Sequence, residues 1–411
     1  MRVLILAGGF GTRLAHLVKD VPKPMAPIGQ TPFIELLMDH LQERGACEFV
    51  LLTGHMSDVI ESYFTRHPRY KDRVGFSRES SPLGTGGAVA MAMSGALDTP
   101  SIVVNGDTFL NCDLEALYRF HIQSGRSATL ALHYQQDGTR YGQVALEGDR
   151  IVSFLEKSQV QGPGLINAGV YVLSPNIVDA IPKEVPVSLE TTVFPQLLQK
   201  GQLGGYPCGG RFIDIGIESD YRRAQVELPK WIAEKPRPAL FLDRDGILVE
   251  DTSYLRHVED IRFREDAIDF IRHYQQQGYL LIVCTNQAGI AKGIISQEQY
   301  TAVHQAIVVG LRQRGVELTD TFMCPDHPEG VLPEFTRVSY DRKPSPGMIL
   351  KAAEKYLIDL PRSFMIGDKV TDRIDLPGLR SYLVQGTYPI SGKGCYSSFA
   401  DLARELQRLD G

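Results

Sequence analysis

Short apolar runs, each ended by a glycine or a polar residue, recur along this chain of 411 residues. Residues 3–7 form the first run, which ends at a glycine pair, as is typical of a buried parallel strand that feeds a loop. Residues 33–41 carry apolar side chains at helical spacing, and residues 49–52 and 101–104 repeat the strand pattern. Alternating strands and helices predict a parallel sheet wrapped by helices.

The pattern changes in the middle of the chain. Short β-like pieces at 142–146, 151–154 and 169–173 predict antiparallel additions around a site. Residues 229–238 then contain three prolines and several charges, which favours a linker over a core element.

Beyond this linker the strand pattern starts again at 239–242, 280–284 and 363–366. Each of these runs is followed by a polar residue, in order Asp243, Thr285 and Asp368. Because ligands of open α/β sheets bind at the carboxyl ends of strands, we expect a second site there. The sequence therefore predicts two different α/β domains, over 1–228 and 239–411.

Composition narrows the classes of partner. The 43 Lys+Arg face 49 Asp+Glu, a net charge of −6, so no global basic field favours nucleic acid. The six cysteines lack paired spacing, which indicates reduced thiols. No signal-like opening and no run of about 18 apolar residues is present, so we expect a cytoplasmic protein without a membrane segment.

The first candidate site begins with a glycine-rich loop. Glycines at positions 8, 9 and 11 let the backbone approach a triphosphate, and Arg13 adds a bidentate cation. A tight turn between strand and helix would use the same glycines, so the loop alone does not decide. Lys23 lies between two prolines, which aim one positive charge at developing phosphate charge.

Three further features fit a nucleotide and a metal ion. Residues 83–88 form a second glycine-rich turn, suited to backbone contacts with a flat base. Asp107 ends a strand-like segment, and Asp214 offers a second carboxylate. Two such groups can hold Mg²⁺ against phosphate oxygens.

Over roughly residues 1–228 the sequence resembles the sugar-1-phosphate nucleotidyltransferases, most of all the D-glycero-D-manno-heptose 1-phosphate guanylyltransferases. The resemblance implies a Rossmann-like, glycosyltransferase-A-like sheet and attack of a sugar 1-phosphate on a nucleoside triphosphate, with release of pyrophosphate. The motifs that carry it are Leu6-Ala7-Gly8-Gly9, Gly11-Thr12-Arg13, Pro22-Lys23-Pro24, the turn at 83–88, Gly106-Asp107, Glu156-Lys157, Asn167-Ala168-Gly169 and Asp214.

The resemblance also assigns roles. It implies that Arg13 and Lys23 stabilise the triphosphate and that Asp107 and Asp214 bind Mg²⁺. The nucleotide-binding positions are Ala7, Gly8, Gly9, Gly11, Thr12, Gly84, Gly86 and Asp107. The sugar-phosphate positions are Glu156, Lys157, Asn167 and Gly169. Ser158 stands where the family often has proline, Glu156-Lys157 alone could be a solvated charge pair, and Asn167 could bond backbone only.

The second candidate site begins with two carboxylates separated by one residue. Asp243 and Asp245 follow an apolar strand, so one can attack phosphorus while the other handles the proton of the leaving group. Three motifs follow later in the chain: Thr285-Asn286-Gln287, Arg342-Lys343-Pro344 and Gly367-Asp368-Lys369.

Across roughly residues 239–390 this set resembles the haloacid-dehalogenase-like phosphatases, which implies a Rossmannoid sheet. The resemblance implies a phosphoaspartyl intermediate on Asp243, with Asp245 as general acid and then base. It places Mg²⁺ on Asp243, the backbone carbonyl of Asp245, and Asp368. The phosphoryl group is assigned to Thr285, Asn286 and Lys343, with Lys369 as a helper. For Asp372, support of the metal and a capping or surface role both stay open.

Details such as Cys324-Pro325-Asp326-His327-Pro328 resemble heptose 1,7-bisphosphate phosphatases and the related histidinol phosphatases. Many members hold a structural zinc with Cys-x-His and Cys-x-Cys. Here Asp326, Ser339 and Asp341 occupy three of the four ligand positions, and only Cys324 is kept. We therefore expect no structural zinc, a loop held by packing, and an Arg342 free to read a distal phosphate.

The two reactions that the resemblances imply are consecutive steps on one sugar. We expect a bifunctional enzyme that removes the C7 phosphate of heptose 1,7-bisphosphate and couples heptose 1-phosphate to GTP. The product would be GDP-heptose for surface glycans such as lipopolysaccharide or S-layer glycan, with Mg²⁺ in both domains. Several alternatives stay open. The sugar could be mannose or glucose 1-phosphate, the nucleotide could be ATP, and the phosphatase could be of the histidinol-phosphate type. One half could also be a non-catalytic regulatory domain, and the protein could form a homo-oligomer.

Overall fold

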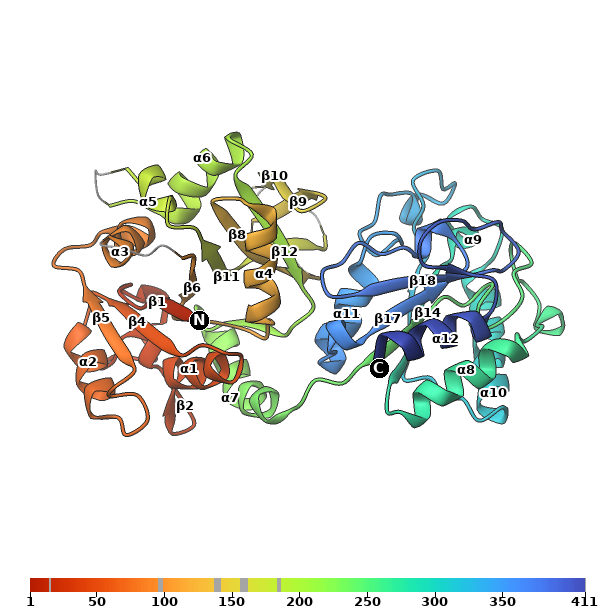
Figure 1. Ribbon diagram of the computed structural model, residues 1–411, viewed down its shortest axis with the longest axis horizontal. Helices are drawn as coiled ribbons and strands as arrows, with labels where there is room; N and C mark the ends of the chain where they lie inside the picture. Colours follow the sequence, from red (N-terminus) through yellow and green to blue (C-terminus); the bar gives the residue numbers. More distant parts are fainter. Residues whose placement is uncertain (15, 95–98, 137–141, 156–161, 183–185, 411) are drawn as a thin grey trace. The chain divides into compact units, whose positions relative to one another are not determined.

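The computed structural model describes residues 1–14, 16–94, 99–136, 142–155, 162–182 and 186–410. The chain divides into two compact units, Met1–Glu234 and Lys235–Gly411, and each is an α/β structure (Figure 1). The predicted fold class is therefore confirmed.

The first unit is built on a nine-stranded sheet with the strand order β5-β4-β1-β6-β11-β8-β12-β10-β9. Four neighbouring strands are parallel, namely β1 (Arg2–Leu6), β4 (Glu48–Thr53), β5 (Val74–Arg78) and β6 (Ser101–Asn105), and β8 and β12 also pair in parallel. The other strands are β8 (Ala128–Gln135), β9 (Gln143–Glu147), β10 (Arg150–Leu155), β11 (Gly164–Leu173) and β12 (Leu203–Cys208). Antiparallel pairing of β9, β10 and β11 confirms the predicted additions.

Helices cover both sides of the parallel strands. In Figure 1, α3 (Gly84–Met93) lies on one side of β1, β4 and β5, and α1 (Phe33–Glu43) lies on the other. The apolar stripe of α1 is buried, as its helical spacing predicts. The remaining helices are α2 (Ser57–Arg66), α4 (Leu114–Ser124), α5 (Ile177–Ala180), α6 (Phe194–Gln199) and α7 (Glu218–Ala233).

Two small ribbons complete the unit. One pairs β7 (Thr108–Leu110) with β13 (Phe212–Asp214) in antiparallel fashion and sets Asp214 opposite Thr108. Asp107 immediately precedes β7, so this ribbon brings together two carboxylates that are far apart in the sequence. The other ribbon pairs β2 (Pro27–Ile28) with β3 (Thr31–Pro32).

The prediction of a linker from residue 229 was wrong in its first half, because α7 continues to Ala233. Pro229 removes one helical N–H donor, yet it lies inside this helix. Leu228 is fully buried, and the Trp231 ring lies 6.3 Å from Phe109 and 5.6 Å from the Arg211 guanidinium. Tertiary packing of the helix end therefore overrides the local proline signal.

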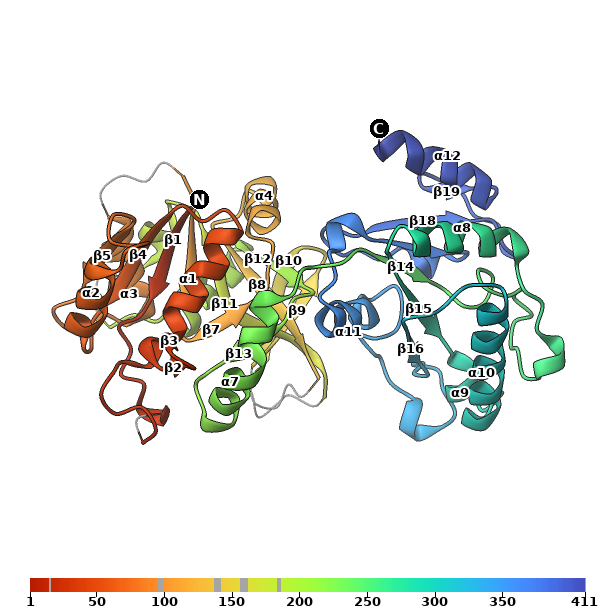
Figure 2. The ribbon, with the colours of Figure 1, turned by 90° about the horizontal axis from the view of Figure 1, so that it is seen from below.

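The second unit contains a six-stranded sheet with the order β16-β15-β14-β17-β18-β19, and its neighbouring strands are parallel. The strands are β14 (Ala239–Leu242), β15 (Leu280–Asn286), β16 (Asp320–Cys324), β17 (Phe364–Gly367), β18 (Arg380–Val384) and β19 (Cys395–Tyr396). The helices are α8 (Glu265–Gln276), α9 (Ala288–Ala291), α10 (Gln297–Gln313), α11 (Gly347–Tyr356) and α12 (Phe399–Asp410). Figure 2 shows α8 and α12 on one side of these strands and α11 on the other.

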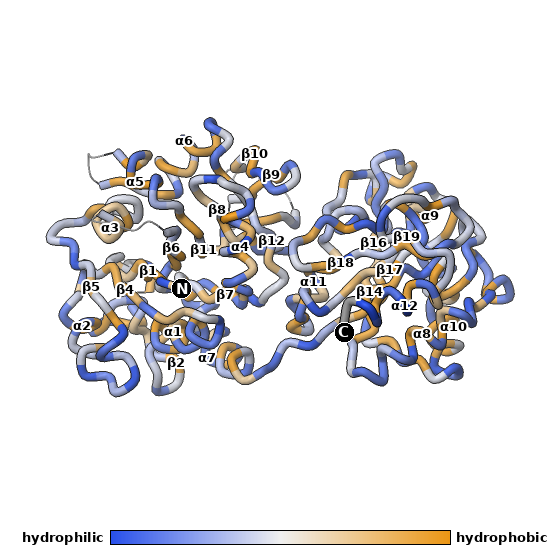
Figure 3. The backbone as a smooth tube through the Cα atoms, in the orientation of Figure 1, coloured by the Kyte–Doolittle hydropathy of each residue, from blue (hydrophilic) through white to orange (hydrophobic). Residues whose placement is uncertain are grey.

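Each unit has its own apolar core. Hydrophobic residues concentrate in the strands and in the helix faces that cover them, whereas the connecting loops are mostly hydrophilic (Figure 3). Because β14 is flanked by β15 and β17 in parallel, the carboxyl ends of all three strands meet at one edge of the sheet. Within the described ranges, no helix has the length and apolar character needed to cross a membrane.

Two candidate phosphate sites

A cavity of about 410 Å³ opens at the carboxyl ends of β1 and β6 in the first unit. It is lined by Leu6, Gly8, Gly9, Phe10, Gly11, Arg13, Lys23, Pro24, Leu52, Glu79, Pro82, Gly84, Thr85, Ala88, Asn105, Asp107 and Gly216. The predicted glycine loop, the predicted cations and one predicted carboxylate therefore surround one space. A cavity of this size falls in the range of small-molecule sites.

Two glycines of the loop, Gly8 and Gly11, pass close to their neighbours. Gly11 has a φ of +59°, and a Cβ there would lie 2.9 Å from the Cβ of Lys23. A Cβ on Gly8 would lie 2.9 Å from Oε1 of Glu79. Gly11 therefore needs glycine for its backbone conformation, whereas a side chain at position 8 would displace the end of the Glu79 side chain.

Lys23 lies between the two predicted metal-binding carboxylates. Its Nζ bonds Oδ2 of Asp107 and lies 3.5 Å from Oδ1 of Asp214. Burial raises the pKa of Asp214, the charge of Asp107 raises it further, and Lys23 opposes both effects. Three charged groups with a net charge of −1 therefore share the end of the β7–β13 ribbon.

The second glycine turn packs against the segment around Val187. Gly84 has a φ of +73°, and a Cβ there would lie 2.4 Å from the carbonyl oxygen of Val187. Gly86 is buried and donates its N–H to the same oxygen at 2.8 Å. Gly84 thus lines the cavity, whereas Gly86 holds the turn through its hydrogen bond to Val187.

Sequence reasoning missed Glu79. Its Oε2 accepts the backbone N–H of Leu83 at 2.9 Å, and its side chain lines the cavity beside the second glycine turn. The available signal was a carboxylate four residues before that turn, between a strand and a glycine-rich helix start.

Other predicted residues have different surroundings. Ala7 is buried behind the cavity. The Asn167 side chain accepts the N–H of Gly169 at 3.0 Å and donates to the Tyr171 hydroxyl at 3.1 Å. Gly169 has a φ of +70° and leaves room for Asn105, which lines the cavity. The side chain of Thr12 and residues Glu156, Lys157 and Ser158 lie outside the described part of the chain.

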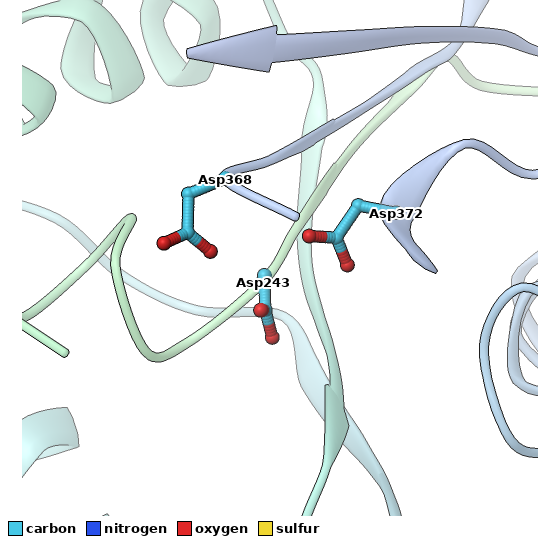
Figure 4. Close-up of side chains that lie close together, drawn as sticks. All are labelled: Asp243, Asp368 and Asp372. Carbon is cyan, nitrogen blue, oxygen red and sulfur yellow. The ribbon is translucent and has the colours of Figure 1, made fainter. Parts of the chain in front are cut away.

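Three carboxyl groups converge in the second unit (Figure 4). Asp243 follows β14, Asp368 follows β17, and Asp372 ends the 3-10 turn Val370–Asp372. One oxygen of each lies within 4.8 Å of the others, and all three residues are buried. The structure thus brings Asp372, whose role was left open, into the predicted site.

A buried lysine compensates part of this charge. Lys343 Nζ lies 2.9 Å from Oδ1 of Asp243 and 2.5 Å from Oδ1 of Asp372. Burial alone would lower the pKa of Lys343, but the two carboxylates outweigh it and raise the pKa. The Asn286 side chain accepts the N–H of Lys343 and donates to its carbonyl, both at 3.0 Å, and so fixes the lysine.

The carboxylate of Asp368, the third of the group, is suited to binding a cation. Both carboxylate oxygens of Asp368 are buried and have no hydrogen-bond partner among the described residues. Burial raises the pKa of Asp368 to about 7, with Lys369 opposing and the nearby carboxylates adding to the shift. A buried carboxylate without a partner is costly, and hard oxygen ligands are those that Mg²⁺ prefers.

Asp245 and Lys369, the predicted general acid and helper lysine, have defined partners. The Asp245 carboxylate accepts hydrogen bonds from the side chains of Arg244 and Gln287. Lys369 Nζ lies 2.7 Å from Oδ2 of Asp251, whose side chain is 3% exposed and which sequence reasoning also missed.

Cys324 and Asp326, in the loop expected to be held by packing, are buried, and ion pairs add to the packing. Asp326 Oδ2 pairs with Nε of Arg337 at 3.0 Å, and Asp341 Oδ2 pairs with Nζ of Lys351 at 2.5 Å. Arg342 is partly buried, and its Nη1 donates to the carbonyl of Asp326 at 3.2 Å. Asp326 and Asp341, two of the residues at the positions compared with zinc ligands, therefore form ion pairs.

Known proteins and family models match the two units of the chain separately. Residues 2–230 match the family model described as Nucleotidyl transferase, and residues 239–388 match the one described as Polynucleotide kinase 3 phosphatase. The D-glycero-alpha-D-manno-heptose 1-phosphate guanylyltransferase of Aneurinibacillus thermoaerophilus is 36% identical over 233 residues, 56% of this chain and 100% of that protein. The D-glycero-alpha-D-manno-heptose-1,7-bisphosphate 7-phosphatase of Photorhabdus laumondii is 40% identical over 156 residues, 37% of this chain and 84% of that protein. The crystal structure of HddC from Yersinia pseudotuberculosis has 33% identity and a TM-score of 0.49, and the match covers 55% of this chain and 99% of that one.

The fold and the two sites define an enzyme with a transferase half and a hydrolase half. The chain belongs to the nucleotidyl transferase family through its first unit, and to the haloacid-dehalogenase-like phosphatases through its second.

Proposed function

We propose that this protein catalyses two consecutive steps of nucleotide-activated heptose synthesis. The second unit removes the C7 phosphate of heptose 1,7-bisphosphate, and the first unit transfers GMP from GTP to the resulting heptose 1-phosphate. The observation that carries the proposal is the presence of both sites on one chain, each similar to a relative named for heptose phosphates. A phosphatase that leaves a sugar 1-phosphate supplies the substrate that the transferase consumes.

The arrangement of the second unit supports a two-step hydrolysis. An oxygen of Asp243 attacks phosphorus, the bond from phosphorus to the C7 oxygen breaks, and that oxygen takes its electron pair and the proton of Asp245. Water then attacks the phosphoaspartate and gives a proton to Asp245, while the acyl oxygen returns to Asp243 as carboxylate. Lys343, 2.9 Å from Asp243, is placed to stabilise the negative charge of the transferring phosphoryl group.

The first unit needs no side-chain nucleophile. A phosphate oxygen of heptose 1-phosphate attacks the α-phosphorus of GTP, and the bond to the pyrophosphate oxygen breaks. Negative charge develops on the phosphate oxygens during this transfer. The cavity is lined by the Gly8–Gly11 backbone, Arg13 and Lys23, whose N–H groups and positive charges would stabilise that charge in the transition state.

Glu79 supports guanine as the base. Its carboxylate lines the cavity and has one acceptor position occupied by the Leu83 N–H. Guanine presents two adjacent donors on its Watson–Crick edge, N1–H and the 2-amino group, which an ionised carboxylate can accept together. Adenine presents an acceptor at N1, which a carboxylate would repel.

Both sites suit Mg²⁺. Asp243 and Asp368 in the second unit, with the backbone carbonyl of Asp245, would hold one ion, and Asp107 and Asp214 in the first would hold another. The ion would neutralise phosphate charge in each reaction. The oxygens of Asp368, which lack a hydrogen-bond partner in the described part of the chain, and the net negative charge around Lys23 favour this assignment.

Two reciprocal variants test the division of labour. Asp243→Asn should abolish phosphate release from heptose 1,7-bisphosphate, yet still form GDP-heptose from heptose 1-phosphate and GTP. Asp107→Asn should release phosphate normally and form no GDP-heptose. Phosphate and pyrophosphate are measured separately, and melting curves check that both variants fold. Phosphate release that persists in Asp243→Asn would contradict the assigned nucleophile.

A further inference from the structure

The side chain of Asp245 is held by two neighbours that no assigned role explains. Arg244 Nε donates to Oδ1 of Asp245 at 3.1 Å, and Arg244 Nη2 donates to Oδ2 at 3.0 Å. The Gln287 amide donates to the same Oδ2 at 2.8 Å. Three N–H groups thus fix the orientation of this carboxylate.

Gln287 uses its whole amide group. Besides the bond to Asp245, its Nε2 donates to Oγ1 of Thr285 at 2.8 Å, and its Oε1 accepts from Nη2 of Arg244 at 3.1 Å. Its backbone N–H donates to the carbonyl of Cys324 at 2.7 Å. One amide therefore ties the predicted general acid to a predicted phosphoryl-binding hydroxyl.

The side chains of Gln287 and Arg244 are buried. Gln287 is 5% exposed and Arg244 is 1% exposed. The Arg244 guanidinium also lies over the Tyr300 ring, 5.2 Å from its centre. A buried amide with all its groups paired has little freedom to reorient, since any rotation leaves a buried polar atom unpaired.

We propose that Gln287 is a positioning residue of the phosphatase, which sets Asp245 relative to the phosphoryl group so that its proton reaches the leaving oxygen. The inference rests on the phosphatase reaction proposed above. Gln287 acts through Asp245 and takes no part in the attack by Asp243.

The choice of leaving group distinguishes a positioning role of Gln287 from a merely structural role. A sugar alkoxide is a poor leaving group and needs a proton, whereas p-nitrophenolate leaves as a stable anion. If Asp245 is no longer positioned, hydrolysis of the sugar phosphate should therefore become slower, whereas the rate of hydrolysis of p-nitrophenyl phosphate should stay nearly the same. Damage to phosphate binding or to the fold should slow both substrates alike.

The test compares Gln287→Met with the wild type on heptose 1,7-bisphosphate and on p-nitrophenyl phosphate. Methionine keeps the length of the side chain and removes its donors. General acid catalysis contributes about 10²–10⁴-fold, so we expect a loss of about tenfold or more in kcat on the sugar, and less than about twofold on p-nitrophenyl phosphate. The matched control is Gln276→Met, at an exposed position on α8, which should change neither rate.

Equal losses on both substrates would overturn the inference, and so would unchanged rates. Failure of the wild type to release phosphate from the sugar would instead contradict the proposed function. Nucleotidyl transfer by the same chain and a melting curve check folding of the variant.

A double variant adds a second, independent readout. In an Asp245→Asn background, Gln287→Met should change the rate on the sugar by less than about twofold, because the group it positions can no longer donate the proton. A further loss comparable to that in the wild-type background would show that Gln287 acts by another route.

Discussion

The sharpest prediction concerns Glu79 and the choice of base. Glu79→Gln keeps the size of the side chain and removes its charge. The amide carbonyl can keep the bond that Leu83 N–H makes at 2.9 Å, which turns the NH₂ group toward the cavity. That group would face a donor of guanine, so one charge-assisted hydrogen bond is lost. Such bonds contribute about 1.5–3 kcal/mol, which predicts a roughly 10- to 150-fold lower kcat/KM for GTP.

The assay measures pyrophosphate release with heptose 1-phosphate and each of GTP, ATP and UTP. For the variant we expect the GTP rate to fall while the ATP and UTP rates change by less than about threefold. The control is Glu115→Gln, whose side chain is 72% exposed on α4. A uniform fall with every nucleotide, or an unchanged preference for GTP, would refute the role of Glu79 in base recognition.

Three further predictions concern the second unit. Burial raises the pKa of Asp368 to about 7, so its contribution to stability without metal is present at acid pH and is lost as the pH rises toward 7. We therefore expect Mg²⁺ to raise the melting temperature more at pH 8 than at pH 5.5, and Asp368→Asn to abolish the difference; an equal response in the variant would contradict this. Lys343→Met leaves Asp243 and Asp372 buried without their cation, so we expect a loss of about 3–5 kcal/mol in the free energy of unfolding and no phosphatase activity, and a variant as stable as the wild type would refute the ion-pair argument. A zinc-selective chelator should leave the melting temperature unchanged, because polar contacts hold the loop after Cys324; a clear fall would indicate a structural zinc.

The sequence was sufficient for most of the strands because burial in a parallel sheet leaves a local pattern. Residues 239–242 are β14 and residues 101–104 lie in β6, as their continuous apolar runs predict. The end of α7 was missed for the opposite reason. Its stability depends on contacts of Leu228 and Trp231 with distant residues, which no local signal reports.

The same distinction applies to the sites. The sequence predicts that Asp243 and Asp368 lie close together, because each follows a strand and parallel strands end at the same edge. Glu79, Asp251 and Gln287 were missed because their contacts join segments that no local pattern connects. Gln287 was visible in its motif, but only the structure shows its amide between Asp245 and Thr285.

The central claim is that one chain uses two sites in succession on the same sugar. The direct measurement incubates the purified protein with heptose 1,7-bisphosphate, Mg²⁺ and one nucleoside triphosphate at a time, and follows phosphate and pyrophosphate separately. The account predicts that phosphate appears with or without nucleotide, and that pyrophosphate appears afterwards and only with GTP. Pyrophosphate formed from ATP alone, or formed before any phosphate is released, would contradict it.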